Sequence, residues 1–393
     1  MPFHKIINDP VYGFITIDDE RIFKLINHPF FQRLRRIQQM AMAQLVYPGA
    51  VHTRLHHALG AYHLMGCALQ ELSSKGIEIT EEEKFSAKAA ILLHDIGHGP
   101  FSHALEHVLA ESFHHEELSL MLMKSLNEEL NGELNMALDI FCDKYHKKFL
   151  HQLISGQLDV DRMDYLTRDS FYTGVNEGVI GYDRIIKMLT VHNGALMVEE
   201  KGIYSIEKFL VARRLMYWQA YLHKTVVSAE QMLQRIIKRA KHIHATCAEP
   251  LNTFINKEAT EFTLEKFCNM DDTDVMMAIK NWCNHTDPIL SALCKGIINR
   301  SLFKLKFRNT PFEQAELEEK QKEMAGKMGL SVDDASWLAF VGEASSSTYN
   351  FEDERIQILF KDGTVKDISA VDNALIHENL RGKVKKYYIC HHR

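Results

Sequence analysis

The sequence predicts a mainly α-helical fold that ends in a small α/β appendage. Helical spacing of apolar residues dominates up to about residue 330, and strand-like runs joined by a Lys-Asp-Gly turn follow it. Hydrophobic residues make up 46% of the 393 residues and charged residues 25%, as is typical of a globular protein with a large core. We therefore expect a core over residues 1–245, a helical extension over 246–330 and a small α/β subdomain over 331–393.

The first helices are expected within the N-terminal hundred residues. Residues 15–50 have the pattern of a helix followed by a loop, and residues 53–72 that of a longer helix. The run TEEE from Thr80 has the spacing of a capping box and precedes apolar residues at helical spacing. Two glycines and a proline follow, so this helix should end near Gly97 and another should begin at Pro100.

Later segments continue the helical pattern before the strands begin. Residues 159–169 and 209–224 are predicted helices, and the charged run 311–329 is typical of a helix with a solvated face. Strands are expected in 337–342, 355–369 and 385–390, with a loop at the serine run 345–347.

Charge and cysteine usage exclude several classes of protein. The 46 Lys and Arg against 52 Asp and Glu give a net charge of -6, so no global positive field favours nucleic acid. We find no signal peptide and no apolar run of about 18 residues, which predicts a cytoplasmic protein without a membrane span. The seven scattered cysteines never form a CxxC pair, which argues against a disulfide framework or a zinc knuckle.

The segment LLHDIGHGPFSH, residues 92–103, concentrates titratable groups behind an apolar run. His94 and Asp95 point about 100° apart on a helix, so they share an ion only if it lies between their side chains. Two ligands hold a divalent cation poorly, and His57 and Asp161 are candidates for the others. From the residues alone, separate buried polar contacts remain an alternative.

Several motifs in order carry a family resemblance. INDPVYGFI, FFQRLRRIQQM, YPGAVHTRLHHALG, HDIGHGPFSH, HHEELS, DVDRMDYLTRD and AYLHK occur within about the first 225 residues. In this region the chain resembles the HD-domain dNTP triphosphohydrolases, the group of the bacterial dGTPases and the mammalian enzymes with SAM and HD domains. No SAM domain is expected before the HD region. The resemblance implies an all-helical HD core.

The resemblance also implies a metal centre and its catalytic groups. It makes His57, His94, Asp95 and Asp161 the ligands of one divalent ion, which these donors do not identify among Mn, Fe, Zn, Ni and Mg. Additional Mg²⁺ would accompany the nucleotide. In the same family positions His103 would be the general acid, and His98 and His115 would contact phosphate.

Further positions are implied to bind the substrate. Tyr221 matches an aromatic residue that closes over the deoxyribose, and Tyr217 stands where the mammalian enzyme has histidine, which leaves base and sugar preference open. From spacing alone, an arginine–tyrosine stripe can also lie over a core edge. The implied triphosphate contacts are Arg54, Arg162, Tyr165 and Arg213, and Gln39 and Asp169 would lie near the sugar.

The implied reaction converts a dNTP to a deoxynucleoside and triphosphate. One alternative is an HD phosphodiesterase or nucleotidase that acts on another nucleotide, and a second is a non-catalytic nucleotide sensor or nucleic-acid-binding protein. The basic run 235–244 could contact nucleic acid, but a solvated helix face is favoured. Control of the dNTP pool and defence against phage both agree with the sequence.

A second nucleotide site is implied between subunits of a homo-oligomer, dimer or tetramer. Asn27 replaces the acidic residue that would bind a guanine edge, so guanine selectivity should weaken there. The alternative is a solvated basic face. The candidate residues are Lys5, Asn8, Asn27, Gln32, Arg35 and Lys224.

Overall fold

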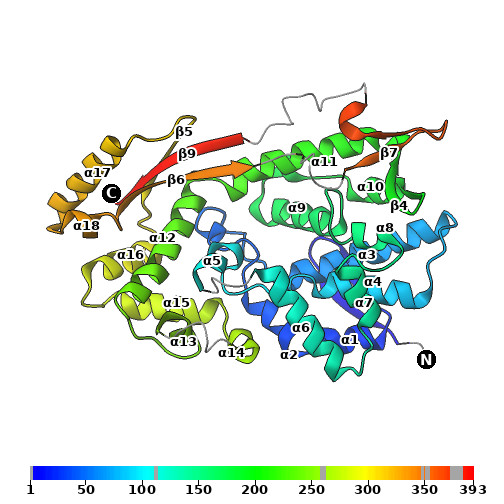
Figure 1. Cartoon of the computed structure of the whole chain (residues 1–393), viewed down its shortest axis with the longest axis horizontal. Coiled ribbons are helices and arrows are strands. Elements are labelled where there is room, and N and C mark those ends of the chain that lie inside the picture. Colours follow the sequence, from blue (N-terminus) through cyan, green and yellow to red (C-terminus); the bar gives the residue numbers. More distant parts are fainter. Residues whose placement is uncertain (1–2, 110–113, 257–262, 347–348, 350–354, 372–383) are drawn as a thin grey trace.

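The computed structural model describes residues 3–109, 114–256, 263–346, 349, 355–371 and 384–393. Within them the chain is mainly helical, as predicted, and the strands form three small sheets. Figure 1 shows the helices in two groups, with a ribbon of strands along the upper edge.

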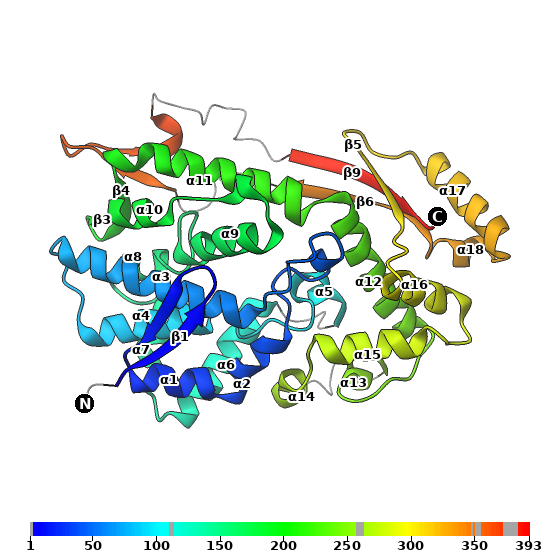
Figure 2. The same cartoon turned by 180° about the vertical axis from the view of Figure 1, so that it is seen from behind.

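An antiparallel hairpin lies near the N-terminus, where the sequence predicts no strand. β1 (Lys5–Asp9) pairs with β2 (Gly13–Ile17). The Asp9 carboxylate accepts hydrogen bonds from the backbone N–H groups of Val11 and Tyr12, which closes the turn. Figure 2 shows this hairpin across the face of the neighbouring helices.

Three helices form the centre of the larger group. α3 (Arg54–Ser74) packs against α4 (Glu81–Leu93) and α9 (Val160–Thr173), which confirms the helices expected there. Thr80 begins α4 through the predicted capping box. The Thr80 hydroxyl accepts from the N–H of Glu83, and the Glu83 carboxylate accepts from the N–H of Thr80. The remaining elements of this group are α1 (Glu20–Asn27), α2 (Pro29–Gln32), η1 (Arg33–Arg36), η2 (Ala43–Leu45), α6 (His115–Glu129), α7 (Asn135–Phe141), α8 (Lys148–Gln152), η4 (Asn176–Gly178) and α10 (Tyr182–Met188).

The turn after α4 differs from the prediction. The helix ends at Leu93, so His94 and the aspartate after it lie just beyond its last turn. No helix begins at Pro100, because Phe101 and Ser102 have left-handed backbone angles, with φ of 54° and 50°. The elements that follow are the 3₁₀ turn η3 (Ser102–Ala104) and the short helix α5 (Glu106–Leu109).

A π-helical segment interrupts the helix predicted over 209–224. α11 (Ile203–Met216) continues into η6 (Tyr217–Tyr221), and α12 (Lys224–His242) follows. The elements of the second group around α12 are α13 (Leu251–Asn256), α14 (Leu264–Cys268), α15 (Asp272–Trp282), α16 (Pro288–Ile298), α17 (Gln314–Met328) and α18 (Val332–Ala335).

The C-terminal strands pair with strands from two earlier regions. β9 (Val384–His391) lies between β5 (Lys304–Arg308) and β6 (Ala339–Ser346), antiparallel to both. β7 (Gln357–Leu359) joins a second sheet in the order β3-β4-β7-β8. Sequence analysis did not predict β5, and it placed a loop at residues 345–347, although the first two of these serines belong to β6. The other strands are β3 (Leu189–His192), β4 (Ala195–Glu199) and β8 (Val365–Asp367), and the short turns are η5 (Glu200–Gly202) and η8 (Ile368–Ala370).

Two hydrophobic clusters correspond to the two groups of helices. The larger cluster includes residues of α1, α3, α4, α9 and α11, and the other includes residues of α12, α15, α16 and the β5-β9-β6 sheet. All seven cysteines are free thiols, which confirms the prediction of no disulfide framework.

Candidate active site

Two imidazole nitrogens and two carboxylates meet between α3, the turn after α4, and α9. His57 Nε2 lies 3.0 Å from Asp161 Oδ1 and 3.7 Å from Asp95 Oδ2. His94 Nε2 lies 3.3 Å from Asp95 Oδ1 and 3.5 Å from Asp161 Oδ1. Neither buried nitrogen has a hydrogen-bond partner. The structure therefore brings together the four residues that were predicted as metal ligands.

The opposite nitrogens of the two rings are held by hydrogen bonds. His57 Nδ1 lies 2.7 Å from Asp164 Oδ2, and His94 Nδ1 lies 2.7 Å from the carbonyl oxygen of Ile91. With a cation bound, the remaining proton of each ring would lie on Nδ1, because these oxygens only accept, and each Nε2 lone pair would face the carboxylates. Unpartnered nitrogens and carboxylates around one point fit a divalent cation, and the donor set does not identify the metal.

An ion-pair chain behind His57 was not found by sequence analysis. Arg168 donates to both oxygens of Asp164 at 3.0 Å and to Asp9 at 2.8 Å. α3 approaches this pair closely because residue 60 is glycine, since a Cβ there would lie 1.9 Å from an Asp164 oxygen. These ion pairs fix the Asp164 carboxylate and therefore the ring of His57.

Charges at the centre interact strongly. Burial opposes a charged ring, but the nearby carboxylates of Asp161 and Asp164 raise the pKa of His57 to about 10. Burial likewise opposes an ionised Asp161, yet His57 and His94 lower the pKa of that carboxyl. A divalent cation would compete with protons for the imidazole nitrogens. Like the protonated rings, it would offset the negative charge of the carboxylates.

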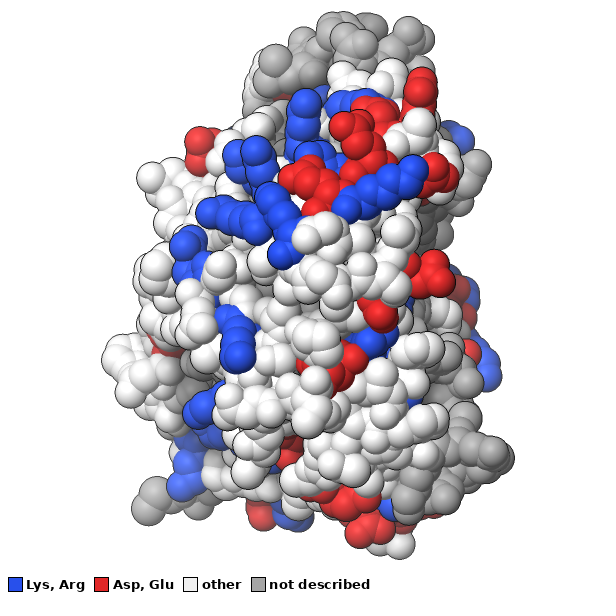
Figure 3. Space-filling view, turned by 90° about the vertical axis from the view of Figure 1, so that its left-hand side faces the viewer, with Lys and Arg blue, Asp and Glu red and all other residues white. Residues whose placement is uncertain are grey.

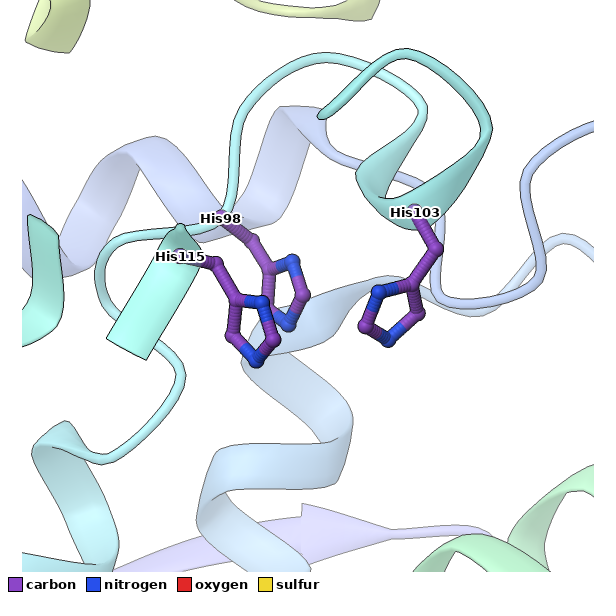
Figure 4. A group of neighbouring side chains, drawn as sticks. All are labelled: His98, His103 and His115. Carbon is purple, nitrogen blue, oxygen red and sulfur yellow. The ribbon is translucent and has the colours of Figure 1, made fainter. Parts of the chain in front are cut away.

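Three further histidines, drawn in Figure 4, form a group next to the centre, and His98 Nε2 lies 3.4 Å from Asp95 Oδ1. The rings of His98 and His115 are stacked, with centroids 4.1 Å apart, and His103 meets each of them edge-on. Glu106 accepts from Nδ1 of His103 at 3.0 Å and from Nδ1 of His115 at 2.7 Å. The parallel rings present their nitrogens side by side, which suits the several oxygens of a phosphate chain. Sequence analysis missed Glu106, although it lies one helical turn after His103.

One cavity of about 470 Å³ connects these groups. It lies between the two hydrophobic clusters, because residues of both line it. His94 adjoins it through Asp95 and Asp161. The other predicted ligands, catalytic groups and substrate contacts all line this cavity, namely Gln39, Arg54, His57, Asp95, His98, His103, His115, Asp161, Arg162, Tyr165, Asp169, Arg213, Tyr217 and Tyr221.

The arginines of the cavity differ in how far they are neutralised. Arg54 forms an ion pair with Asp95 and donates from Nε to Ser102 Oγ at 2.8 Å. Arg162 pairs with Asp159, but its Nε has no partner. The Nε and one terminal nitrogen of Arg213 are buried without a hydrogen bond. These unpartnered donors suit an anionic ligand.

Tyr221 and Asp169 form a wall of the cavity in which Asp169 already has two partners. The Tyr221 hydroxyl donates to Asp169 Oδ2 at 2.7 Å, and His52 Nε2 lies 2.7 Å from Oδ1. The ring of Tyr217 lies 5.3 Å from that of Tyr221, within the π-helical segment η6. The widened turn, which often occurs at functional sites, directs both phenols into the cavity.

Asp272 of α15 braces the cavity from the second group of helices. Its carboxylate accepts from the N–H of Gln38 at 2.8 Å and from the N–H of Phe101 at 2.7 Å. Burial raises the pKa of Asp272 to about 7. This carboxylate joins the segment before Gln39 to the left-handed turn before His103, and sequence analysis missed it because the contacts are distant in the chain.

The residues predicted for a second nucleotide site lie outside the cavity. Lys5 and Asn8 are on β1, Asn27 ends α1, and Lys224 begins α12, and all four are exposed. Gln32 accepts from Arg35 Nε at 2.7 Å. The proposed nucleotide contact of these residues stays a prediction.

The basic run 235–244 lies largely on α12, and its arginines face inward. Arg235 stacks on the ring of Phe340, and Arg239 pairs with Asp287 at 2.6 Å. The expectation of a solvated face is therefore wrong for these two arginines. On α17, in contrast, Lys320 pairs with Glu323 at 2.5 Å in the solvated manner that was predicted. Figure 3 shows Lys and Arg interspersed with Asp and Glu on that end of the molecule.

Comparisons with known proteins identify the domain to which the residues of this site belong. A model of the HD domain matches residues 54–169, and a model of the HD-associated region matches residues 180–335. The YwfO protein of Bacillus subtilis is 32% identical over 96% of this chain and 90% of its own length. A SAMHD1 homologue of Dictyostelium discoideum, which bears the name deoxynucleoside triphosphate triphosphohydrolase, is 31% identical over 58% of this chain and 48% of its own length.

One solved structure matches this chain over the full length of both proteins. The crystal structure of a phosphohydrolase from Bacteroides thetaiotaomicron is 47% identical and superposes with a TM-score of 0.96. No helix among the described residues is both long and apolar enough to cross a membrane. The two family models, the full-length matches and the converging histidines and aspartates lead to one assignment: the chain belongs to the HD-domain phosphohydrolase family.

Proposed function

We propose that this protein is a deoxynucleoside triphosphate triphosphohydrolase, which converts a dNTP and water to a deoxynucleoside and triphosphate. One observation carries the proposal: a single cavity holds the converging ligands, three imidazoles and the unpartnered guanidinium nitrogens of Arg213. A triphosphate needs several cationic donors in a row beside the reacting phosphorus, and this cavity supplies them.

The ligands His57, His94, Asp95 and Asp161 would hold one divalent cation, of Mn, Fe, Zn, Ni or Mg. Such an ion supplies Lewis-acid polarisation of the phosphate and activation of water when it is bound. The chain's own contribution is to hold these four donors in place before the ion arrives, through Asp164, Arg168 and the carbonyl group of Ile91.

The imidazoles would serve the leaving group. As an oxygen of water bonds to the α-phosphorus and this water releases one proton to the solvent, the bond from phosphorus to the 5′-oxygen breaks, and His103 gives a proton to that oxygen. Glu106 accepts from His103 Nδ1, so the carboxylate would orient the ring and direct Nε2 away from itself. Burial lowers the pKa of His98 far below its ordinary value, so this ring is a neutral contact for phosphate.

The remaining cavity residues would hold the nucleotide. Arg54, Arg162 and Arg213 neutralise the phosphates, and Tyr165 contacts them. Tyr221, held by Asp169, closes over the deoxyribose, with Tyr217 and Gln39 nearby. A relative at 31% identity that bears the name of a dNTP triphosphohydrolase supports this choice of substrate.

We also propose a homo-oligomer, dimer or tetramer, that a second nucleotide activates through Lys5, Asn8, Asn27, Gln32, Arg35 and Lys224, all of which except Gln32 are exposed. Sedimentation with and without dNTP, together with the rate as a function of dNTP concentration, tests this proposal. A linear rate and unchanged assembly for every nucleotide would contradict it.

Product analysis tests the main proposal. Metal-loaded protein is incubated with each of the four dNTPs and with GTP, and the products are separated by ion-pair chromatography. We expect triphosphate and a deoxynucleoside in equal amounts. Release of pyrophosphate or orthophosphate without triphosphate would instead support the alternative of a phosphodiesterase or nucleotidase for another nucleotide.

A further inference from the structure

One face of α12 forms a wall of the cavity that the proposed reaction leaves unexplained. Val226, Glu230 and Gln234 recur at intervals of four residues, so they share this face, and all three line the cavity. Met40 and Leu222 border the same cavity with apolar atoms. This wall therefore combines apolar surface with one carboxylate and one carboxamide.

Glu230 has no partner among the residues that the structure describes. Burial alone raises the pKa of its carboxyl to about 8, with no hydrogen bond or cation to oppose that effect. The side chain is half-buried in the cavity wall, and nothing there stabilises its ionised form. A ligand that donates hydrogen bonds to Glu230 would stabilise the carboxylate and lower its pKa.

The ligand group that meets Glu230 is not the triphosphate. Arg54, Arg162 and Arg213 line the cavity and attract phosphate, whereas a carboxylate repels it. A nucleotide that places its phosphates at the arginines must direct another part toward the acidic wall. Apolar atoms beside an acceptor are the environment that the face and edge of a nucleobase require.

The chemistry of the acceptor discriminates among the bases. A carboxylate offers two adjacent acceptors, and guanine offers two adjacent donors, N1–H and the exocyclic amine. Adenine and cytosine place an acceptor beside their amine, and thymine has one N–H between two carbonyl groups. Gln234 Oε1 accepts from Gln231, so its amide N–H groups are available for a carbonyl oxygen such as guanine O6.

We infer that Glu230, assisted by Gln234, binds the Watson–Crick edge of guanine and makes dGTP the preferred substrate. The inference rests on the proposed function. It names a base preference that the resemblance left open, and it concerns the substrate cavity and not the second nucleotide site.

Substitution of Glu230 tests the inference. Glu230→Gln keeps the shape but places an amide donor against the guanine donors. We expect kcat/KM for dGTP to fall about 100-fold while that for dTTP changes little, because an unmatched donor is costly inside a closed site. Lys238→Gln, an exposed change on the same helix, should leave both values unchanged. Thermal unfolding checks that both variants are folded.

The outcomes separate the inference from the proposed function. If triphosphate is released from all four dNTPs with equal efficiency, or if Glu230→Gln keeps a dGTP preference, the inference is wrong and the proposed function stands. If no dNTP yields triphosphate, the proposed function is wrong. Calorimetric binding of deoxyguanosine and deoxyadenosine then decides about Glu230, since equal affinities would overturn the inference and loss of a guanosine preference in Glu230→Gln would support it.

Discussion

The acidic groups at two parts of the site differ in their partners. One part is the ligand cluster of His57, His94, Asp95 and Asp161, and the other is the α12 wall with Glu230. In the cluster, Asp161 faces two imidazoles and Asp164 is paired with Arg168, and these partners lower the pKa of both carboxyls although burial would raise it. On α12, Glu230 has no such partner, and burial raises its pKa. The difference teaches that the ligand cluster is organised by its own partners, whereas the ionised form of Glu230 on the α12 wall has none among the described residues.

The largest effect is expected from breaking the organised cluster. Asp161→Asn removes one carboxylate from the point where four donors meet, so we expect loss of bound metal and a decrease in turnover of more than about 100-fold. Metal analysis and product assays measure both. Asp183→Asn, an exposed change on α10, is the matched control. Full metal content and activity in Asp161→Asn would show that the cluster is not the metal centre.

A second change sharpens the comparison without touching the ligands. Glu106→Gln leaves the imidazoles in place but replaces the carboxylate that accepts from Nδ1 of His103 and of His115. We expect kcat to fall about 100-fold at nearly constant KM and constant metal content. Glu116→Gln, exposed at the start of α6, is the control. A raised KM with unchanged kcat would instead assign Glu106 to substrate binding.

A smaller effect is expected at the brace between the two groups of helices. Asp272→Asn replaces one of two acceptors by a donor, so one backbone N–H of Gln38 or Phe101 loses its partner, which destabilises the turn by about 1–3 kcal/mol. We expect turnover to fall about tenfold with the metal retained. Faster hydrogen exchange at Phe101 would locate the change, and unaltered exchange would contradict it.

The smallest effect concerns stability and has a defined dependence on pH. A carboxyl whose pKa is raised from an ordinary value near 4.5 to about 8 binds its proton more tightly in the folded protein. Wild type therefore loses stability as pH rises through this window, and Glu230→Gln does not. Near pH 4 the two proteins should unfold alike, and above pH 8 the variant should be more stable by about 2 kcal/mol. A variant less stable at high pH would reveal a partner for Glu230.

Local sequence signals predicted much of the helical framework. The capping box at Thr80 and the apolar spacing of α3 and α9 depend on neighbouring residues, so they are visible in the chain itself. The helix expected from Pro100 is wrong because distant groups hold Phe101 in a left-handed conformation. The hairpin β1–β2 was missed, although its buried and exposed residues partly alternate.

The candidate site divides in the same manner. The predicted ligands and substrate contacts lie within motifs, and they adjoin one cavity. Asp272 and Glu230 belong to no motif. Asp272 matters because it accepts from residues distant in the chain, and Glu230 because it is half-buried without a partner among the described residues. Asp164 lies inside the motif DVDRMDYLTRD and Glu106 three residues after HDIGHGPFSH, and helical spacing from Asp161 and His103 could have indicated them.

The contact between Asp272 and Phe101 also sets an order of events during synthesis on the ribosome. The two residues are 171 positions apart, so the turn that carries His103 emerges long before the carboxylate that braces it. A nascent chain that has just completed the HD motif still lacks this support. Residues 54–169 alone therefore lack this brace, and the turn before His103 can gain it only after α15 has been made.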